Sequence, residues 1–309
     1  MKKPSYVIVV GFLEIIVTVN YETPFSPIFI YNDHGRLQAS VVMNTSIQIY
    51  NDIVTKVTFF FKQLKLNIKP SSTGRPLSIN PIETISLSLF KQSQGIPTKK
   101  AIWNIFRPRC SYKTLVVNLN RFVISALLIL QSILKWNQKH AHLVKHTDST
   151  DIPVCLAKNG KRHKTMKGLA AWAYSAKGWY YGLKMLITTD LKRNLLAVRF
   201  ASGNANEREV FKKLNKDMLG IFVADAGYIS KDLERDFYLE NKRILFAKPR
   251  ANMKRIATEW QNRLYNTRMQ IELNFRNLKL FYHLETSLPK SIDGYLGNYV
   301  YSLLAYVLR

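Results

Sequence analysis

The pattern of hydrophobic positions changes near residue 143. Between residues 46 and 142 apolar side chains recur every three or four positions, which is typical of amphipathic helices. Glycine and proline at Gly74-Arg75-Pro76 and Arg107-Pro108-Arg109 interrupt this pattern. The pattern predicts an all-α N-terminal domain with helices at 48–66, 81–92, 99–106 and 112–139.

After residue 143 short runs of β-branched and aromatic residues alternate with polar helical stretches. This alternation is typical of a layered α/β structure with a mixed sheet. The predicted strands are 143–147, 179–188, 195–201, 221–224 and 244–247, and the predicted helices are 206–217, 230–241, 258–280 and 293–308.

Residues 1–45 show no clean period, and we assign them no role. Met43 directly precedes the first helical stretch, which raises the hypothesis that residues 1–45 are an artefactual extension. The apolar start of the chain resembles a signal peptide, but Glu14 interrupts it and no small-residue cleavage site follows. We therefore expect a cytoplasmic protein.

The net charge of the chain indicates which class of molecule it binds. The 309 residues include 46 Lys and Arg against 20 Asp and Glu, a net charge of +26, and residues 1–147 carry half of this excess. Such a field attracts polyanions, so nucleic acid is the expected partner rather than a membrane. The apolar run 122–134 is shorter than the roughly 20 residues that span a bilayer. The two cysteines exclude a disulfide framework and a four-thiolate zinc site.

Two of the scarce carboxylates follow predicted strands. Asp148 closes the strand predicted at 143–147, and Asp225 follows the strand predicted at 221–224. Ligands bind at the carboxyl ends of strands in open α/β sheets. Asp is also a common turn and helix-cap residue, and on position alone that interpretation is favoured.

A third carboxylate, Glu272, lies in the helix predicted at 258–280. On a wheel of 100° per residue it shares an arc of roughly 80° with four other residues. An apolar stripe beside it should dock on the sheet and consists of Trp260, Leu264, Ile271, Phe275 and Leu278. The alternative is a solvated face with an ordinary Arg–Glu pair. The four residues that share the arc with Glu272 are Tyr265, Arg268, Arg276 and Lys279.

Carboxylates that lie among basic side chains are consistent with an enzyme that transfers phosphoryl groups. Two divalent cations held by a few carboxylates can activate a nucleophile and stabilise the leaving oxygen. Mg²⁺ suits this role because it takes oxygen ligands while it binds substrate phosphates. Tyr, Arg and Lys side chains would position the DNA backbone without contacting its bases.

The spaced residues Tyr265-x2-Arg268-x3-Glu272-x6-Lys279 reproduce a known signature. The chain resembles bacterial insertion-sequence DDE transposases, which carry this Y-R-E-K pattern. The likeness runs from about residue 70 to the C-terminus and favours catalytic roles for the two aspartates. Surrounding phrases agree with it, namely Asp148-Ser149-Thr150, Gly182-Leu183-Lys184, Ser202-Gly203-Asn204, Asp225-Ala226-Gly227-Tyr228 and Asn252-Met253-Lys254.

The resemblance implies an RNase H-like catalytic domain at 143–309, preceded by a helical DNA-binding domain at 46–142. It further implies that Asp148, Asp225 and Glu272 are the catalytic, metal-binding triad and hold two Mg²⁺ or Mn²⁺ ions. Tyr265, Arg268, Arg276 and Lys279 are then expected to bind DNA.

The implied reaction is cleavage at the element ends followed by strand transfer into target DNA. The expected partner is double-stranded DNA, both element ends and target, with no membrane, a homo-oligomer on the DNA, and association with the bacterial nucleoid. Asp151 is the rival to Asp148 for the first position.

Three positions depart from the family pattern. Leu186, Ala226 and Glu207 stand where the family has histidine, lysine and aspartate. A decayed relic that only binds DNA therefore stays an alternative, as does another RNase H-like nuclease or resolvase.

Overall fold

The computed structural model describes residues 39–66, 76–247 and 257–309, with side chains from Thr45 on. Residues 46–309 form one unit by their contacts, and residues 1–45 form another. The phrases Gly74-Arg75 and Asn252-Met253-Lys254 lie outside the described residues, as do residues 1–38.

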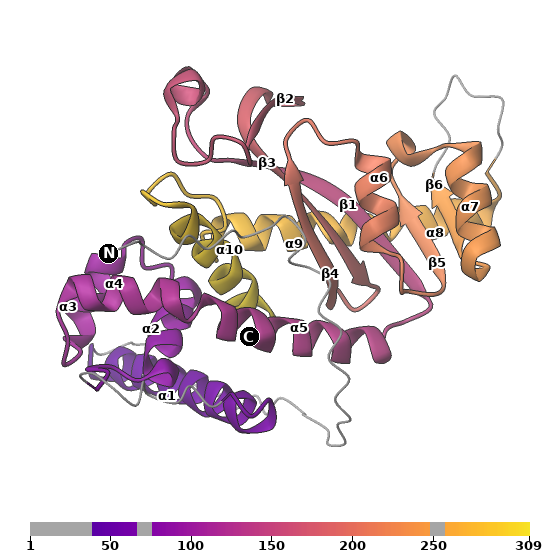
Figure 1. The fold of residues 1–309 in the computed structure, drawn as a ribbon. Helices are drawn as coiled ribbons and strands as arrows, with labels where there is room; N and C mark the ends of the chain where they lie inside the picture. The colour runs from indigo at the N-terminus through magenta and orange to yellow at the C-terminus, as the bar shows by residue number, and fades with distance from the viewer. Residues whose placement is uncertain (1–38, 67–75, 248–256) are drawn as a thin grey trace. The chain divides into compact units, whose positions relative to one another are not determined.

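Within the described residues, five helices precede the sheet (Figure 1). α2, α3 and α4 begin where a polar side chain caps them: for example, Asn80 accepts a hydrogen bond from the N–H of Glu83, and Ser111 accepts one from that of Thr114. The helices are α1 (Ala39–Gln63), α2 (Pro81–Ser93), α3 (Lys99–Phe106), α4 (Tyr112–Arg121) and α5 (Val123–Lys139).

The prediction of a single helix at 112–139 is wrong. The structure divides it at Phe122 into α4 and α5, which are bent by 44°. Hydrogen bonds continue across the joint, from Phe122 N–H to Asn118 and from Ala126 N–H to Phe122. Because the bend turns the Phe122 side chain into the core, where it is 1% exposed, packing compensates for the break.

The sheet has the strand order β2-β3-β1-β5-β6, and β4 pairs with β3 next to β2, on the edge of β3 that faces away from β1. β3 is antiparallel to β1 and to β4, whereas β5 runs parallel to β1 and β6 parallel to β5. A mixed sheet with helices, preceded by a helical part, confirms the predicted fold class. The strands are β1 (Val144–Pro153), β2 (Ala171–Ser175), β3 (Gly178–Asp190), β4 (Leu195–Ser202), β5 (Ile221–Ala224) and β6 (Ile244–Ala247).

The pattern did not predict β2, a short strand that forms a hairpin with the start of β3. Its turn ends at Gly178, whose φ of +104° is a conformation that other residues rarely adopt. Five residues are too few for their alternation to stand out from the loops around them.

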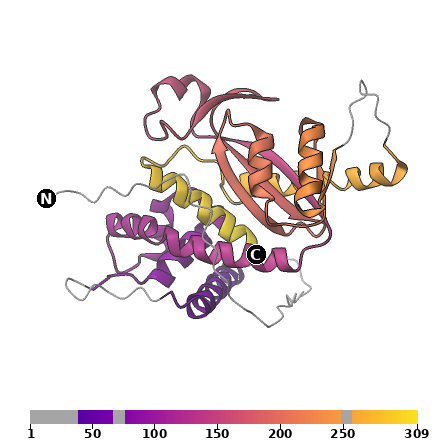
Figure 2. The same ribbon diagram turned by 45° about the vertical axis from the view of Figure 1, so that its right-hand side comes forward.

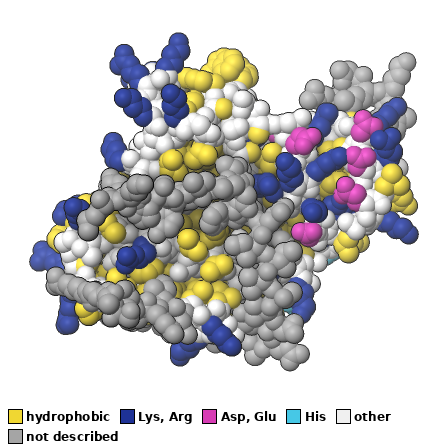
Figure 3. Space-filling view, in the orientation of Figure 1, with side chains coloured by type: hydrophobic (Ala, Val, Ile, Leu, Met, Phe, Trp, Pro, Cys, Tyr) yellow, Lys and Arg dark blue, Asp and Glu magenta, His cyan; other side chains and the backbone are white. Residues whose placement is uncertain are grey.

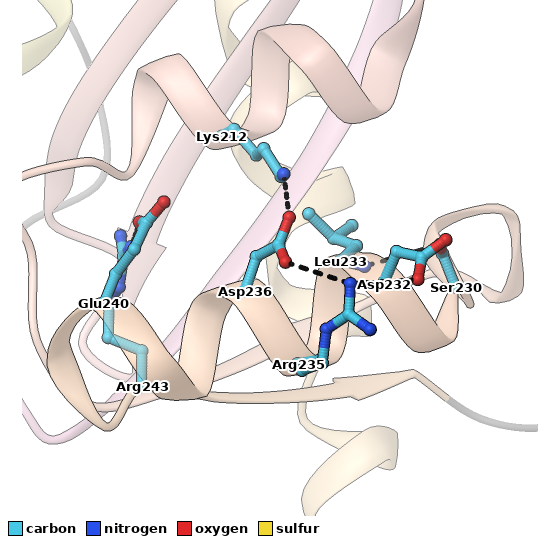
Figure 4. A network of polar contacts seen from close by, with 8 residues as sticks. All are labelled: Lys212, Ser230, Asp232, Leu233, Arg235, Asp236, Glu240 and Arg243. Atoms are coloured by element: carbon cyan, nitrogen blue, oxygen red, sulfur yellow. Dashed lines mark hydrogen bonds and ion pairs between the residues drawn. The ribbon is translucent and has the colours of Figure 1, made fainter.

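Helices cover both faces of the sheet (Figures 1 and 2). α6 (Glu207–Leu214) and α7 (Lys231–Asn241) pack on one face over Leu186, Phe222 and Leu245. Lys212 of α6 forms an ion pair with Asp236 of α7, as Figure 4 shows. Short 3-10 turns, η1 (Ala157–Arg162) and η2 (Ala226–Tyr228), lie in the connections.

The other face carries α9 (Met269–Leu280), which follows α8 (Glu259–Asn266), and the chain ends in α10 (Ile292–Val307). α10 contacts α2, α4 and α5, and it also reaches the sheet, where Tyr299 stacks on Phe200 at 5.0 Å between ring centroids. The Tyr295 hydroxyl donates to the carbonyl of Val154 and that of Tyr301 to the carbonyl of Leu119. One hydrophobic core therefore joins the N-terminal helices to the α9 face of the sheet.

Candidate active site

The first two predicted triad residues lie on adjacent parallel strands. The register pairs His146 of β1 with Val223 of β5, and each aspartate lies two residues beyond one member of this pair. Since side chains alternate along a strand, Asp148 and Asp225 project from the same face of the sheet. The topology thus brings together two residues that are 77 positions apart in the sequence.

The expectation that Asp148 closes its strand is wrong. β1 continues to Pro153 because its antiparallel partner β3 pairs with it from Lys145 to Pro153. The parallel partner β5 pairs only from Val144 to His146. Asp148 therefore lies in mid-strand, just past the point where the parallel pairing ends.

A guanidinium lies among the three predicted carboxylates. Arg268 Nη2 is 2.7 Å from Asp148 Oδ2, and Arg268 Nη1 is 3.5 Å from Glu272 Oε1. The Tyr265 hydroxyl donates to Asp225 Oδ1 at 3.4 Å, and the charge of Asp225 acts on Arg268. Arg268 thus pairs with Asp148 and Glu272, and Tyr265 contacts Asp225.

The helix that supplies Arg268 is broken there, contrary to the single helix predicted at 258–280. α8 and α9 are joined at Thr267 and Arg268, where hydrogen bonds run from residue i to i−3, including Arg268 N–H to Tyr265. Both residues keep right-handed helical angles, so the joint tightens the helix without reversing it. The arrangement on a regular wheel therefore does not extend across residue 267.

Burial is different for the two ends of the predicted apolar stripe. Ile271, Phe275 and Leu278 are buried against the sheet, as predicted. Trp260 is 60% exposed, and this expectation is wrong. Its helix, α8, lies before the joint, so the face that docks α9 does not continue along it.

Burial also governs the charge of Asp148, whose side chain is 14% exposed. Desolvation raises the pKa of this carboxyl to about 6. The Arg268 charge and the Ser149 N–H, which donates to Oδ1 at 2.8 Å, oppose the rise, while the charges of Asp225 and Glu207 add to it. Ionised Asp148 is therefore held in the fold at a cost.

For Arg268, neighbouring charges outweigh the effect of burial on the pKa. Burial lowers the pKa of Arg268, but the charges of Asp148 and Asp225, together with Tyr265 and Glu272, raise it above its ordinary value. Arg268 is thus a permanent cation whose side chain is 12% exposed.

A buried histidine, His146, lies at the helix joint that carries this arginine. His146 Nε2 lies 2.8 Å from the hydroxyl of Thr267, which in turn donates to the carbonyl of Leu264. Burial and the Arg268 charge lower the pKa of His146 to about 4, against the effect of Asp190. Neutral His146 therefore packs at the helix joint without adding charge to the site.

The remaining residues of the predicted basic stripe lie apart from the triad. Lys279 donates to the carbonyl of Asp151 at 2.6 Å and forms ion pairs with Asp151 and Glu285. Arg276 is exposed, and we find no ion pair for it within the described residues. Among the three cations of the stripe, Arg268 is thus the one that contacts Asp148.

This geometry can be compared with known proteins. A family model described as a transposase DDE domain matches residues 138–292, which is half of the chain. The chain belongs to the DDE transposases. The matched span contains the mixed sheet, α8 and α9, and hence all three carboxylates around Arg268.

Solved structures add only distant likenesses to this transposase. The Mos1 mariner paired end complex with Mn is 10% identical over 71% of this chain and 85% of that one, with a TM-score of 0.22. A pre-cleavage Mos1 transpososome is 12% identical over 80% of this chain and 83% of that one, with a TM-score of 0.23. Scores this low support no residue-level argument. No curated protein matches the chain.

DDE transposases use divalent metals, and the donor set of this site is consistent with that use. Asp148, Asp225 and Glu272 offer only carboxylate oxygens, which are ligands that Mg²⁺ and Mn²⁺ accept. Among the described residues, however, no group of three His, Cys, Asp or Glu is close enough to hold one ion. Arg268 forms ion pairs with Asp148 and Glu272 and supplies the positive charge beside them.

The pattern missed two contributors to the transposase site. His146 lies two residues before Asp148 and therefore on the same face of β1. The two-residue period of side chains along a strand could have identified it as a neighbour of the site. Glu207 begins α6, is paired with Lys184 at 2.6 Å and adds to the charge around Asp148. It reaches the site by packing of α6 on β3, which no local pattern reveals.

No single helix among the described residues of the transposase is long and apolar enough to cross a membrane; α4 and α5 satisfy length and composition only together, as a bent pair.

Proposed function

We propose that this DDE transposase acts on an insertion sequence and that Asp148, Asp225 and Glu272 are its catalytic triad. The observations that carry the proposal are the ion pairs of Arg268 with Asp148 and Glu272 and the hydrogen bond from the neighbouring Tyr265 to Asp225. Arg268 is largely buried, and a buried cation paired with two acids is unusual in a chain so short of acids.

The triad would hold two divalent ions, Mg²⁺ or Mn²⁺. When bound, such ions activate the attacking oxygen and stabilise the leaving oxygen of an in-line phosphoryl displacement. The parallel pairing of β1 and β5 puts Asp148 and Asp225 on one face of the sheet, and α9, which carries Glu272, packs against that face, which supports this proposal.

Arg268 has two uses in this proposal. In the arrangement described here it neutralises Asp148 and Glu272, which otherwise repel each other and Asp225. If the carboxylates held ions, the Arg268 guanidinium would be free to contact a DNA phosphate, to which it can bind through two parallel hydrogen bonds. The Tyr265 hydroxyl, now on Asp225, lies beside it for the same phosphate.

The proposed substrate is double-stranded DNA, both element ends and target. The net charge of +26 supports this choice, because it attracts polyanions and supplies many phosphate contacts. The same charge supports association with the nucleoid. Assembly as a homo-oligomer on DNA rests on the family resemblance.

The test uses DNA that flanks the gene, in which short inverted repeats bounded by a target duplication mark the element ends. Purified protein with Mg²⁺ should cleave there, and Asp148→Asn should abolish cleavage while Asp151→Asn retains it. Asp151 is the matched control because it lies on the same strand and is paired with Lys279 instead. Cleavage by Asp148→Asn at the wild-type rate would refute the triad.

One alternative gives a different pattern in this assay. If the wild-type protein binds the element ends and does not cleave them with Mg²⁺ or Mn²⁺, the copy is a relic that only binds DNA. The departures at Leu186 and Ala226 motivate this alternative, although Leu186 is fully buried in the apolar core.

A further inference from the structure

Two aromatic side chains lie exposed at the end of the β2–β3 hairpin. Tyr174 and Trp179 are 70% and 65% exposed. The register pairs them directly across the two strands, and their rings meet edge to face at 5.5 Å between centroids. This contact stabilises the hairpin, as cross-strand aromatic pairs do. It leaves most of each ring open to a further flat partner.

The 3-10 turn η1 packs closely against this hairpin. A Cβ atom at Gly160 of η1 would lie 2.5 Å from the ring of Trp172 on β2, so only glycine permits this approach. Trp172 in turn packs on Tyr181 of β3, at 5.6 Å between ring centroids. The side chains of η1 and those of the hairpin are therefore held beside one another.

This part of the chain is strongly basic. Residues 152–189 contain seven Lys and Arg and no Asp or Glu. One of the seven, Lys184, is paired with Glu207. The other six are exposed, and none of them forms an ion pair with the residues that the structure describes. Figure 3 shows Lys and Arg side chains gathered around η1, next to hydrophobic side chains at β2. The six are Lys158, Lys161, Arg162, Lys164, Lys167 and Lys177.

The aromatic pair projects from the same face of the sheet as Asp148. Ile187 of β3 lies opposite Asp148 of β1, and Trp179 precedes Ile187 by eight residues. Because side chains alternate along a strand, this even separation puts Trp179 on the face of Ile187 and Asp148. At roughly 3.3 Å per residue the pair lies about 26 Å along the sheet from Asp148, which is roughly the length of eight base pairs. DNA that reaches Asp148 can therefore extend to the hairpin.

We propose that the β2–β3 hairpin binds an unpaired DNA base, which stacks on Trp179 while the cations around η1 bind the flanking phosphates. Open aromatic rings beside cations are the usual platform for unstacked bases, and stacking tolerates any base. The usual wedges between paired bases are Phe, Leu, Ile, Met and Pro, so a Trp–Tyr pair favours an unpaired base. A second copy of this chain, itself at +26, would be repelled by these cations. The proposal rests on DNA being the substrate, and its test does not require cleavage.

The test compares two labelled duplexes of one sequence, one fully paired and one with a short internal bubble of unpaired bases. Fluorescence anisotropy measures binding of the full chain to each, without metal. Trp179→Ala should weaken binding to the bubble duplex at least about fivefold and change binding to the paired duplex by less than about twofold. Trp179→Phe should retain most of the preference for the bubble, because it keeps an aromatic face.

A 2-aminopurine base in the bubble reports the stacking itself, because its fluorescence falls when it stacks on a ring. The wild type should quench this fluorescence, and Trp179→Ala should not. The matched control is Trp260→Ala, which removes an indole that is 60% exposed on α8, outside the hairpin. This control should bind both duplexes and quench the base as the wild type does.

Two results would overturn this proposal and leave the proposed substrate intact. One is wild-type affinity and quenching in Trp179→Ala, whose replaced side chain is exposed, so the variant should fold. The other is an equal loss of affinity for both duplexes, which would make the hairpin a contact to paired DNA. If the wild type bound neither duplex, DNA would not be the substrate, and the proposed function would fail together with this inference.

Discussion

Replacing Asp148 by Asn should stabilise the metal-free protein at pH 8. The pKa of Asp148 rises from the ordinary value of 3.8 to about 6, chiefly through burial. One pH unit of pKa corresponds to about 1.4 kcal/mol, so the ionised carboxylate costs the folded state about 3 kcal/mol at pH 8. This cost already includes the favourable Arg268 contact, which lowers the pKa.

The sign follows from linkage. Because the folded pKa is raised, the penalty is fully present above pH 6 and disappears as the pH falls to about 4. The amide has no such penalty, and it leaves Arg268 with Glu272 and with the charge of Asp225. The stability difference between variant and wild type should therefore be large at pH 8 and vanish near pH 4.

Urea unfolding with a chelator at both pH values measures this difference. The control is Asp232→Asn on α7, whose side chain is 80% exposed and should change stability by less than about 0.5 kcal/mol. A variant that is less stable than the wild type at pH 8, or equally stabilised at pH 4, would refute the assignment of a buried, strained charge to Asp148.

Three further predictions concern the cations. Arg268→Ala should raise the pKa of Asp148 further, because the charge of Arg268 lowers that pKa. The same variant should slow cleavage at least about tenfold relative to Lys212→Ala. Equal rates for the two variants in single-turnover assays would contradict this. Lys279→Ala should destabilise the fold by about 1.5 to 3 kcal/mol in urea unfolding, since Lys279 is buried against Asp151 and Glu285, whereas exposed Arg276→Ala should not. Duplex binding should weaken with salt at a log–log slope of about −0.9 per phosphate contacted, and a flat dependence would point to a partner other than DNA.

Local patterns predicted most elements of this fold and the order of its three carboxylates along the chain. They could not predict that β1 runs past Asp148 to Pro153, because that length is determined by pairing with β3, some 40 residues away. Strand pairing is a tertiary effect, and local propensity does not encode it.

The helix wheel failed at Thr267 for a related reason. Neither Thr267 nor Arg268 is a helix breaker, and both keep helical angles, so nothing in the local sequence marks the change to i−3 hydrogen bonds. The contact of Thr267 with buried His146 lies at this joint. As a result Arg268, predicted to lie on a DNA-facing stripe, contacts Asp148, and Lys279 contacts Asp151.

Single-turnover cleavage by Asp225→Asn tests the central claim most directly. Among the described residues, the Asp225 side chain accepts a hydrogen bond from the hydroxyl of Tyr265, so the change to Asn removes the charge with little loss of contact. With Mg²⁺ and DNA carrying the element ends, the variant should bind the ends as the wild type does and leave them uncut. Cleavage by the variant at the wild-type rate would show that Asp148, Asp225 and Glu272 are not the catalytic triad.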